Sequence, residues 1–141
     1  MKGSQMSRTD NLKRQHQEIV KIVTEISGYL IPDRAKADAP KVHTLLSSLA
    51  GKLKLHLATE DKILYPELLK HNDEKVKVVT KKFMTEMGTI GAVFEGYLGK
   101  WKTPADIQNN PAGFVADTKG LFDVLAKRVT KEEAELYPLA G

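Results

Sequence analysis

The chain has 141 residues, of which 41% are hydrophobic and 28% are charged, and this balance is typical of one soluble, globular domain. The absence of cysteine excludes disulfides, thiolate metal sites and cysteine nucleophiles. The net charge of +4 comes from lysines dispersed among acidic residues, which does not indicate nucleic-acid binding. No apolar run indicates a signal peptide or a membrane span, so we expect a cytoplasmic protein.

The first predicted helix spans residues 10–30, with Asp10 as its N-terminal cap. Its apolar residues recur every three or four positions, as on one face of a helix: Leu12, Ile19, Ile22, Val23, Ile26 and Leu30. His16 falls on the same face, between Leu12 and Ile19. Two prolines in residues 31–40 then predict a loop.

The second predicted helix spans residues 41–70, and two polar residues interrupt its apolar face. That face contains, in order, Leu45, Leu46, Leu49, Leu53, His56, Glu60 and Ile63. Pro66 lacks the N–H that a regular helix needs, so we expect a kink, or the end of the helix, near Tyr65. Residues 71–74 are predicted to form a turn.

The third predicted helix spans residues 75–101, and its face is apolar throughout: Val76, Val79, Phe83, Met87, Ile90, Phe94, Tyr97 and Trp101. Gly88, Gly91, Gly96 and Gly99 each lower helix propensity by roughly 1 kcal/mol relative to alanine. We expect them to allow a close contact with another helix. Residues 102–113 are predicted as the longest loop.

The fourth predicted helix spans residues 114–137, and charged residues again stand at apolar positions. Its face contains Leu121, Leu125, Arg128, Glu132 and Leu136. Four amphipathic helices with short polar connections and no strand signal predict an all-α fold, specifically an up-down-up-down antiparallel four-helix bundle. We expect a single domain over residues 1–141, with residues 1–9 flexible.

The fourth helix repeats the second. The stretch HLATEDKILYP (56–66) aligns without gaps with RVTKEEAELYP (128–138), so that Glu60 matches Glu132 and Arg128 replaces the histidine. A weaker match relates residues 15–19 to residues 86–90. The chain therefore predicts two helical hairpins related by a pseudo-twofold axis, whose matched positions can face each other across the core.

The polar residues of these helix faces can form a metal site. His56 and Glu60 lie four residues apart, so they share one helix face and can bind the same ion. His16 adds a second imidazole, and Glu132 or Glu133 adds a carboxylate. This combination suits iron, manganese or zinc. The alternative is a set of ion pairs at one end of the bundle, although each unpaired buried charge costs several kcal/mol.

These motifs resemble those of the hemerythrin-like, or HHE cation-binding, family. The resemblance rests on QHQEI in the first helix, HLATEDKILYP in the second and KEEAELYP in the fourth, and it covers about residues 8–139. It implies a four-helix bundle that binds two irons through histidines and two bridging carboxylates. It also implies a function in oxygen binding or in sensing nitric oxide, redox state or iron.

Residue by residue, the resemblance implies that His16, His56 and Glu60 are metal ligands. It also implies a second bridging carboxylate in the fourth helix. We prefer Glu132 to Glu133 for this role, because Glu132 shares the helix face and the repeat with Glu60.

The ligands that the family has for a second iron are missing. Phe83 and Met87 stand where the family has two histidines in the third helix, and Arg128 replaces the histidine of the fourth. We therefore expect one ion rather than two, with iron as the first choice and zinc or manganese as alternatives, or no metal at all. Our hypothesis is that Arg128 replaces the lost cation by pairing with Glu60 or Glu132, while Phe83 and Met87 fill the space. The alternative is that Arg128 extends to solvent.

Three functions are compatible with these residues. The first is a metal-binding or sensing module with a reduced site, which could bind a small diatomic ligand. The second is a metal-free bundle that acts through a protein partner, and the third is an enzyme such as an iron oxidase or a peroxide-handling protein. We favour the first, and hence a protein that is not an enzyme. No nucleic-acid or membrane partner is indicated, and the oligomeric state is not predicted.

Overall fold

The structure, a computed structural model, describes residues 8–140, and within this range every regular element is helical. The α-helices are α1 (Arg8–Ser27), α2 (Pro32–Ala37), α3 (Ala39–Thr59), α4 (Tyr65–Leu69), α5 (Glu74–Lys100), α6 (Pro104–Asn109) and α7 (Pro111–Lys131). Two π-helical turns, η2 (Glu60–Leu64) and η3 (Glu132–Leu136), and a 3-10 turn, η4 (Tyr137–Ala140), complete the chain. The predicted all-α class is confirmed.

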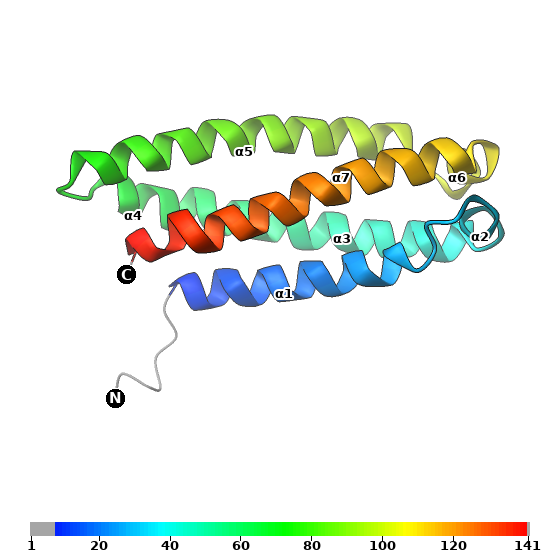
Figure 1. The fold of residues 1–141 in the computed structure, drawn as a ribbon, viewed down its shortest axis with the longest axis horizontal. Helices are drawn as coiled ribbons and strands as arrows, with labels where there is room; N and C mark the ends of the chain where they lie inside the picture. The colour runs from blue at the N-terminus through cyan, green and yellow to red at the C-terminus, as the bar shows by residue number, and fades with distance from the viewer. Residues whose placement is uncertain (1–7, 141) are drawn as a thin grey trace.

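The long helices lie side by side along the long axis of the molecule (Figure 1), and the chain direction alternates from α1 to α3, α5 and α7. α1 packs against α3 and α7, and α5 packs against α7. The short helices α2 and α6 pack against each other at one end of the molecule. Among the described helices, none combines the length and apolar character that crossing a membrane requires.

The two segments predicted as loops contain the short helices α2 and α6, so the prediction of four helices is wrong in number. Pro32 and Pro104 begin these helices, because proline at the first position lacks only an N–H that would have no partner within the helix. Each short helix also buries an apolar side chain, Ala35 in α2 and Ile107 in α6. The prolines therefore start helices here and do not only interrupt them.

The first helix differs from its predicted bounds. α1 begins at Arg8, so Asp10 lies in the first turn and does not cap the helix, and α1 ends at Ser27. A carboxylate in the first turn still faces the positive end of the helix dipole. The predicted flexibility of residues 1–9 concerns mainly residues 1–7, which lie outside the described residues, and the other two are helical.

Both copies of the repeated motif contain a π-helical turn just before their proline. In η2 the N–H of Tyr65 donates to the carbonyl of Glu60, five residues earlier, and in η3 the N–H of Tyr137 donates to that of Glu132. The wider turn suits a following proline, which has no N–H and whose ring crowds the carbonyl four residues before it. The expected irregularity near Tyr65 is thus a widened turn, a feature often found at functional sites.

The widened turn changes which residue faces the core. Ile63, predicted on the apolar face, is 45% exposed, whereas its neighbour Leu64 is fully buried. In a regular helix both the third and the fourth residue after Glu60 lie near its face, whereas in the wider π turn only the fourth does. The same spacing separates Glu132 from the buried Leu136 in η3. The prediction for Ile63 is therefore wrong.

The apolar core has two parts. The larger is built from residues of α1, α2, α3, α5, α6 and α7, and the smaller contains Leu12, Leu64, Tyr65, Leu68, Val76, Phe83, Leu136 and Tyr137. Along the helices, the buried polar residues His16, His56, Glu60, Arg128 and Glu132 lie between the two parts. A polar layer thus separates the two apolar clusters.

The glycines of α5 do not mark a helix contact. A methyl group added at Gly88, Gly91, Gly96 or Gly99 would meet no described atom within 4 Å beyond the adjoining helix backbone. The prediction that these glycines allow a close approach is wrong, because the face that carries them is open at these positions.

The register set by η2 predicts unequal effects of two neighbouring substitutions. Leu64→Ala removes a fully buried side chain and should lower the free energy of unfolding by about 2–5 kcal/mol. Ile63→Ala should lower it by less than about 1 kcal/mol, since that side chain is largely exposed. Urea-induced unfolding followed by circular dichroism measures both. A larger loss at Ile63 than at Leu64 would contradict this register.

Candidate metal centre

Four ionisable side chains, none more than 3% exposed, meet where the two apolar clusters separate. His16 comes from α1 and His56 from the last turn of α3. Glu60 and Glu132 are the first residues of the two π turns, η2 and η3. Because burial of charged groups is costly without compensating partners, their mutual contacts determine whether this layer is stable.

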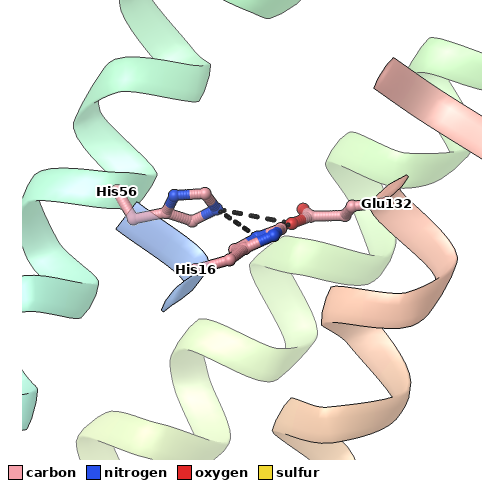
Figure 2. Close-up of side chains that lie close together, drawn as sticks. All are labelled: His16, His56 and Glu132. Carbon is pink, nitrogen blue, oxygen red and sulfur yellow. Dashed lines mark hydrogen bonds and ion pairs between the residues drawn. The ribbon is translucent and has the colours of Figure 1, made fainter. Parts of the chain in front are cut away.

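The side chains of His16, His56 and Glu132 point toward one another from three different helical segments (Figure 2). His16 Nε2 lies 3.0 Å from His56 Nε2 and 2.9 Å from Glu132 Oε1. His56 Nε2 lies 3.4 Å from the same oxygen and 3.3 Å from Glu60 Oε2. Ligand atoms of the first three residues all lie within 4.8 Å of one another, a spacing that allows one metal ion to bind them together.

A chain of hydrogen bonds fixes the orientation of His56. The Thr59 hydroxyl donates to the carbonyl of Leu55, so its oxygen accepts from the Gln15 side-chain amide at 3.2 Å. The amide oxygen of Gln15 then lies 2.9 Å from His56 Nδ1 and accepts from it. The proton on Nδ1 leaves Nε2 of a neutral His56 unprotonated, with its lone pair toward the other donor atoms.

Glu133 orients the second imidazole in the same way. Its carboxylate, which is partly exposed, lies 2.7 Å from Nδ1 of His16 and accepts a hydrogen bond from it. Nε2 of a neutral His16 is then also unprotonated. Two imidazole lone pairs from the adjacent helices α1 and α3 therefore point at the same place.

The hydroxyl oxygen of Tyr137 lies among these atoms. It is 3.0 Å from Glu60 Oε2, 3.2 Å from Glu132 Oε1, 3.2 Å from His16 Nε2 and 3.3 Å from His56 Nε2. Tyr137 is buried, and its ring stacks on that of His16 with centroids 5.4 Å apart. We call His16, His56, Glu60, Glu132 and Tyr137 the histidine cluster. When both imidazoles are neutral, the acceptor atoms that face one another in this cluster outnumber the protons available to them, which favours the binding of a cation.

The two carboxylates of the histidine cluster also have partners on their other side. Glu132 Oε2 accepts from Nε of Arg128 at 3.0 Å, and Glu60 Oε1 accepts from the Tyr65 hydroxyl at 3.3 Å. Nη2 of Arg128 in turn donates to the Tyr65 oxygen at 3.4 Å. Each carboxylate therefore directs one oxygen toward the histidines. The other oxygen contacts Arg128 in the case of Glu132 and Tyr65 in the case of Glu60.

Arg128 is buried on the side of the polar layer that also contains Tyr65 and Phe83, which we call the arginine half. The side that contains His16, His56 and Tyr137 is the histidine half. The guanidinium of Arg128 has several partners. Nη2 donates to the carbonyl of Phe83 at 2.9 Å, and the guanidinium carbon lies 4.7 Å from the centroid of the Phe83 ring. The hypothesis that Arg128 pairs with Glu132 is confirmed, and the alternative that it extends to solvent is wrong. Phe83 is buried, while Met87 is only half-buried.

The carboxylates control the protonation of His56. Burial lowers the pKa of His56, but hydrogen bonds and charges from Glu132 and Glu60 outweigh this effect and raise the pKa to about 9. Burial raises the pKa of Glu132, but hydrogen bonds to His16 and His56 hold it well below its usual range. Burial is also the main cause of a raised pKa at Glu60. Without a metal ion, a protonated His56 therefore faces an ionised Glu132.

The structure brings together four of the five residues predicted to bind a metal: His16, His56, Glu60 and Glu132. The fifth, Glu133, contacts the outer nitrogen of His16 and lies outside the cluster of facing donor atoms. This arrangement agrees with the preference for Glu132 over Glu133. That any of these residues binds a metal stays a prediction.

Sequence reasoning gave no role to Tyr137, Tyr65 or Gln15. A signal for the tyrosines exists, because Leu-Tyr-Pro follows the glutamate in both copies of the repeat. The π turn that returns each hydroxyl toward a carboxylate is not visible in residue spacing. Gln15 has no signal, since a residue next to His16 is expected on another part of the helix surface.

A family model described as hemerythrin HHE cation binding domain matches residues 7–140. No match was found among curated proteins or among solved structures. The matched range includes Arg128 and the whole histidine cluster.

Arg128→Met keeps much of the side-chain volume but removes the buried donor to Glu132 Oε2 and the side-chain donor to the Phe83 carbonyl. This variant should lower the free energy of unfolding by about 3–5 kcal/mol. The control is Lys127→Met, since Lys127 pairs with Asp123 on the surface and should lose only about 0–1 kcal/mol. Chemical denaturation measures both values, and equal small effects would contradict a stabilising guanidinium.

The protonation of His56 predicts that the metal-free protein is less stable in alkali. Its folded-state pKa of about 9 lies above the ordinary histidine pKa of 6.5, so the stabilising contribution is fully present below pH 6.5 and is lost as the pH rises through 9. The expected loss is at most about 3 kcal/mol, measured by thermal unfolding with a chelator present. His56→Gln should flatten this part of the profile, and an unchanged profile would assign it to another group.

Proposed function

The chain belongs to the hemerythrin HHE cation-binding domain family, and from that premise we propose that it is a metal-binding module that holds a single ion. The ion would be bound by His16, His56 and Glu132, with Glu60 beside them. We further propose that α1, α3, α5 and α7 act as an up-down-up-down four-helix bundle that places these residues in one layer.

The orientation of the two imidazoles carries this proposal. His16 donates through Nδ1 to Glu133, and His56 donates through Nδ1 to Gln15. Histidines that bind metals commonly donate their other ring N–H to a carboxylate or carbonyl oxygen, which fixes the tautomer and the direction of the lone pair. Both Nε2 atoms therefore have the arrangement expected of ligands, and buried carboxylate oxygens stand beside them.

The opposite half of the layer does not fit a second ion. Arg128 stands where the repeat has a histidine in the other copy, and its guanidinium already neutralises the second oxygen of Glu132. Phe83 has no donor atom in its side chain, and the thioether of Met87 is a soft ligand unlike imidazole or carboxylate. We therefore propose one ion where the family resemblance implies two.

Two imidazoles and one carboxylate suit ferrous iron, and zinc or manganese can use the same donors. A bound ion would supply Lewis acidity and, in the case of iron, a redox-active position for a small diatomic ligand. Glu133 and Gln15 orient the two imidazoles toward the position of the ion. The apolar clusters on either side of the layer exclude water from it. Iron is our first choice.

We propose a binding or sensing role in preference to an enzyme. The donor atoms are buried, and a buried site accepts a diatomic molecule more readily than a larger substrate. Iron oxidation usually requires two metals, and the arginine half supports only one. We also propose a protein partner whose binding depends on whether the site is occupied.

The alternative is a metal-free bundle that acts through a protein partner, and one observation favours it. Within residues 8–140, every buried side-chain nitrogen and oxygen has a hydrogen-bond partner in the protein itself. With His56 protonated, two positive charges, on His56 and Arg128, balance the carboxylates of Glu60 and Glu132. A proton could thus replace the ion.

Metal analysis separates the two candidates. Protein purified without a chelating step and reconstituted with ferrous iron, manganese or zinc should retain about one ion per chain. His56→Ala should lose the ion, while His71→Ala should keep it, because His71 is an exposed histidine in the turn before α5. Elemental analysis of the folded variants gives the stoichiometry, with circular dichroism as the check on folding.

Each other result has a distinct meaning. Retention of none of the three metals would favour the metal-free bundle. Two ions per chain would contradict the assignment of Arg128 to the second half. Turnover of ferrous iron or peroxide by the loaded protein would promote the enzyme over the binding module.

A further inference from the structure

The hydroxyl of Tyr137 has more neighbours than its single proton can serve. It lies within 3.0–3.3 Å of one atom from each of the four other members of the histidine cluster. A phenol has one proton, which can serve one strong acceptor, and the nearest is Glu60 Oε2. When both imidazoles are neutral and carry their proton on Nδ1, as a metal site requires, its oxygen also stands beside two Nε2 lone pairs to which it can offer no proton.

The repeat supplies an internal comparison for this oxygen. Tyr65 holds the matching position in the other copy, and its hydroxyl lies between a Glu60 oxygen and the guanidinium of Arg128. In the arginine half, the tyrosine oxygen thus faces a cation. Because Tyr137 matches Tyr65 in the repeat, its oxygen corresponds to one that faces a cation in the other copy, and here it faces the two imidazoles.

The backbone places Tyr137 for this contact. In the π turn η3, the N–H of Tyr137 donates to the carbonyl of Glu132, five residues earlier. The side chain then reaches back to the carboxylate of the same glutamate. Stacking on His16 fixes the ring, since the two planes are inclined by only 20°. The oxygen is therefore held in place before any ion binds.

From this geometry we propose that Tyr137 is itself a ligand of the ion and binds it through the phenolate oxygen. The inference rests on the proposed function, because it requires an ion at this place. In forming the bond, the phenol O–H would break, the oxygen would gain a bond to the metal, and the proton would pass to the carboxylate of Glu60, its nearest acceptor. No oxidant or reductant is needed.

A ferric ion bound to a phenolate absorbs visible light by charge transfer, and histidines and carboxylates do not produce this band. The wild-type protein loaded with ferric iron should show the band, and resonance Raman excitation within it should show phenolate ring vibrations. Tyr137→Phe should lose the band while still retaining about one ion per chain at saturating iron. This variant keeps the ring and its stacking on His16.

Tyr65→Phe is the matched control. It removes the equivalent hydroxyl from the arginine half, where it contacts Arg128 and Glu60 and lies away from the imidazoles. This variant should keep the band of the wild-type protein. If the protein holds zinc and not iron, the readout becomes the near-ultraviolet difference spectrum of an ionised tyrosine, which should appear in Tyr65→Phe and be absent from Tyr137→Phe.

The outcomes distinguish this inference from the proposed function. A wild-type protein that holds about one ion per chain without phenolate signals would overturn the role of Tyr137 alone. Persistence of the signals in Tyr137→Phe, or their loss in Tyr65→Phe, would also overturn it. Failure of the wild-type protein to hold any of the three metals would overturn both. Raman measurements on the wild-type protein and on Tyr65→Phe keep the inference testable even if Tyr137→Phe does not fold.

Discussion

The burial of Glu60 and Glu132 in one layer is the constraint on which the rest of the structure depends. Two carboxylates in a low-dielectric interior require positive charge or donated protons close to each oxygen. Each carboxylate has one oxygen toward the histidines and one toward Arg128 or Tyr65, so compensation comes from both sides. The π turns that begin at these two glutamates, and the apolar clusters on either side of the layer, keep this arrangement dry and in register.

The helical periodicity was sufficient to predict the long helices and to group the polar residues in one layer, because a polar residue at an apolar position still follows the helix face. It failed at Ile63, since the π turn depends on backbone hydrogen bonds and the following proline, which side-chain patterns do not report. The role of Tyr137 was missed for the same reason. The short helix that begins at Pro32 was missed because a proline in a sequence is more readily interpreted as the end of a helix than as its first residue. A pairing of Arg128 with Glu60 or Glu132 could be proposed from the repeat, but the fold was required to select Glu132, four residues further along the same helix.

The two halves of the layer differ in the kind of positive charge that they hold. The guanidinium of Arg128 is a cation that is covalently part of the chain. The histidine half can hold a proton on His56 or, in our proposal, a metal ion in its place. One scaffold thus combines a permanent cation with an exchangeable one. The permanent cation keeps the carboxylate pair partly neutralised, so the exchangeable one can leave without placing two uncompensated negative charges side by side.

The partners of Arg128 also restrict the sequence changes that this protein can tolerate. A histidine at that position would offer fewer donors to Glu132 and the Phe83 carbonyl, while the facing residues of α5 would still bind no metal. A polar residue in place of Phe83 would face a guanidinium that already has its partners. Intermediates between this form and a symmetric two-ion form would therefore be less stable than either. Asymmetry in such a chain can persist through the requirement to fold, independently of any selection for activity.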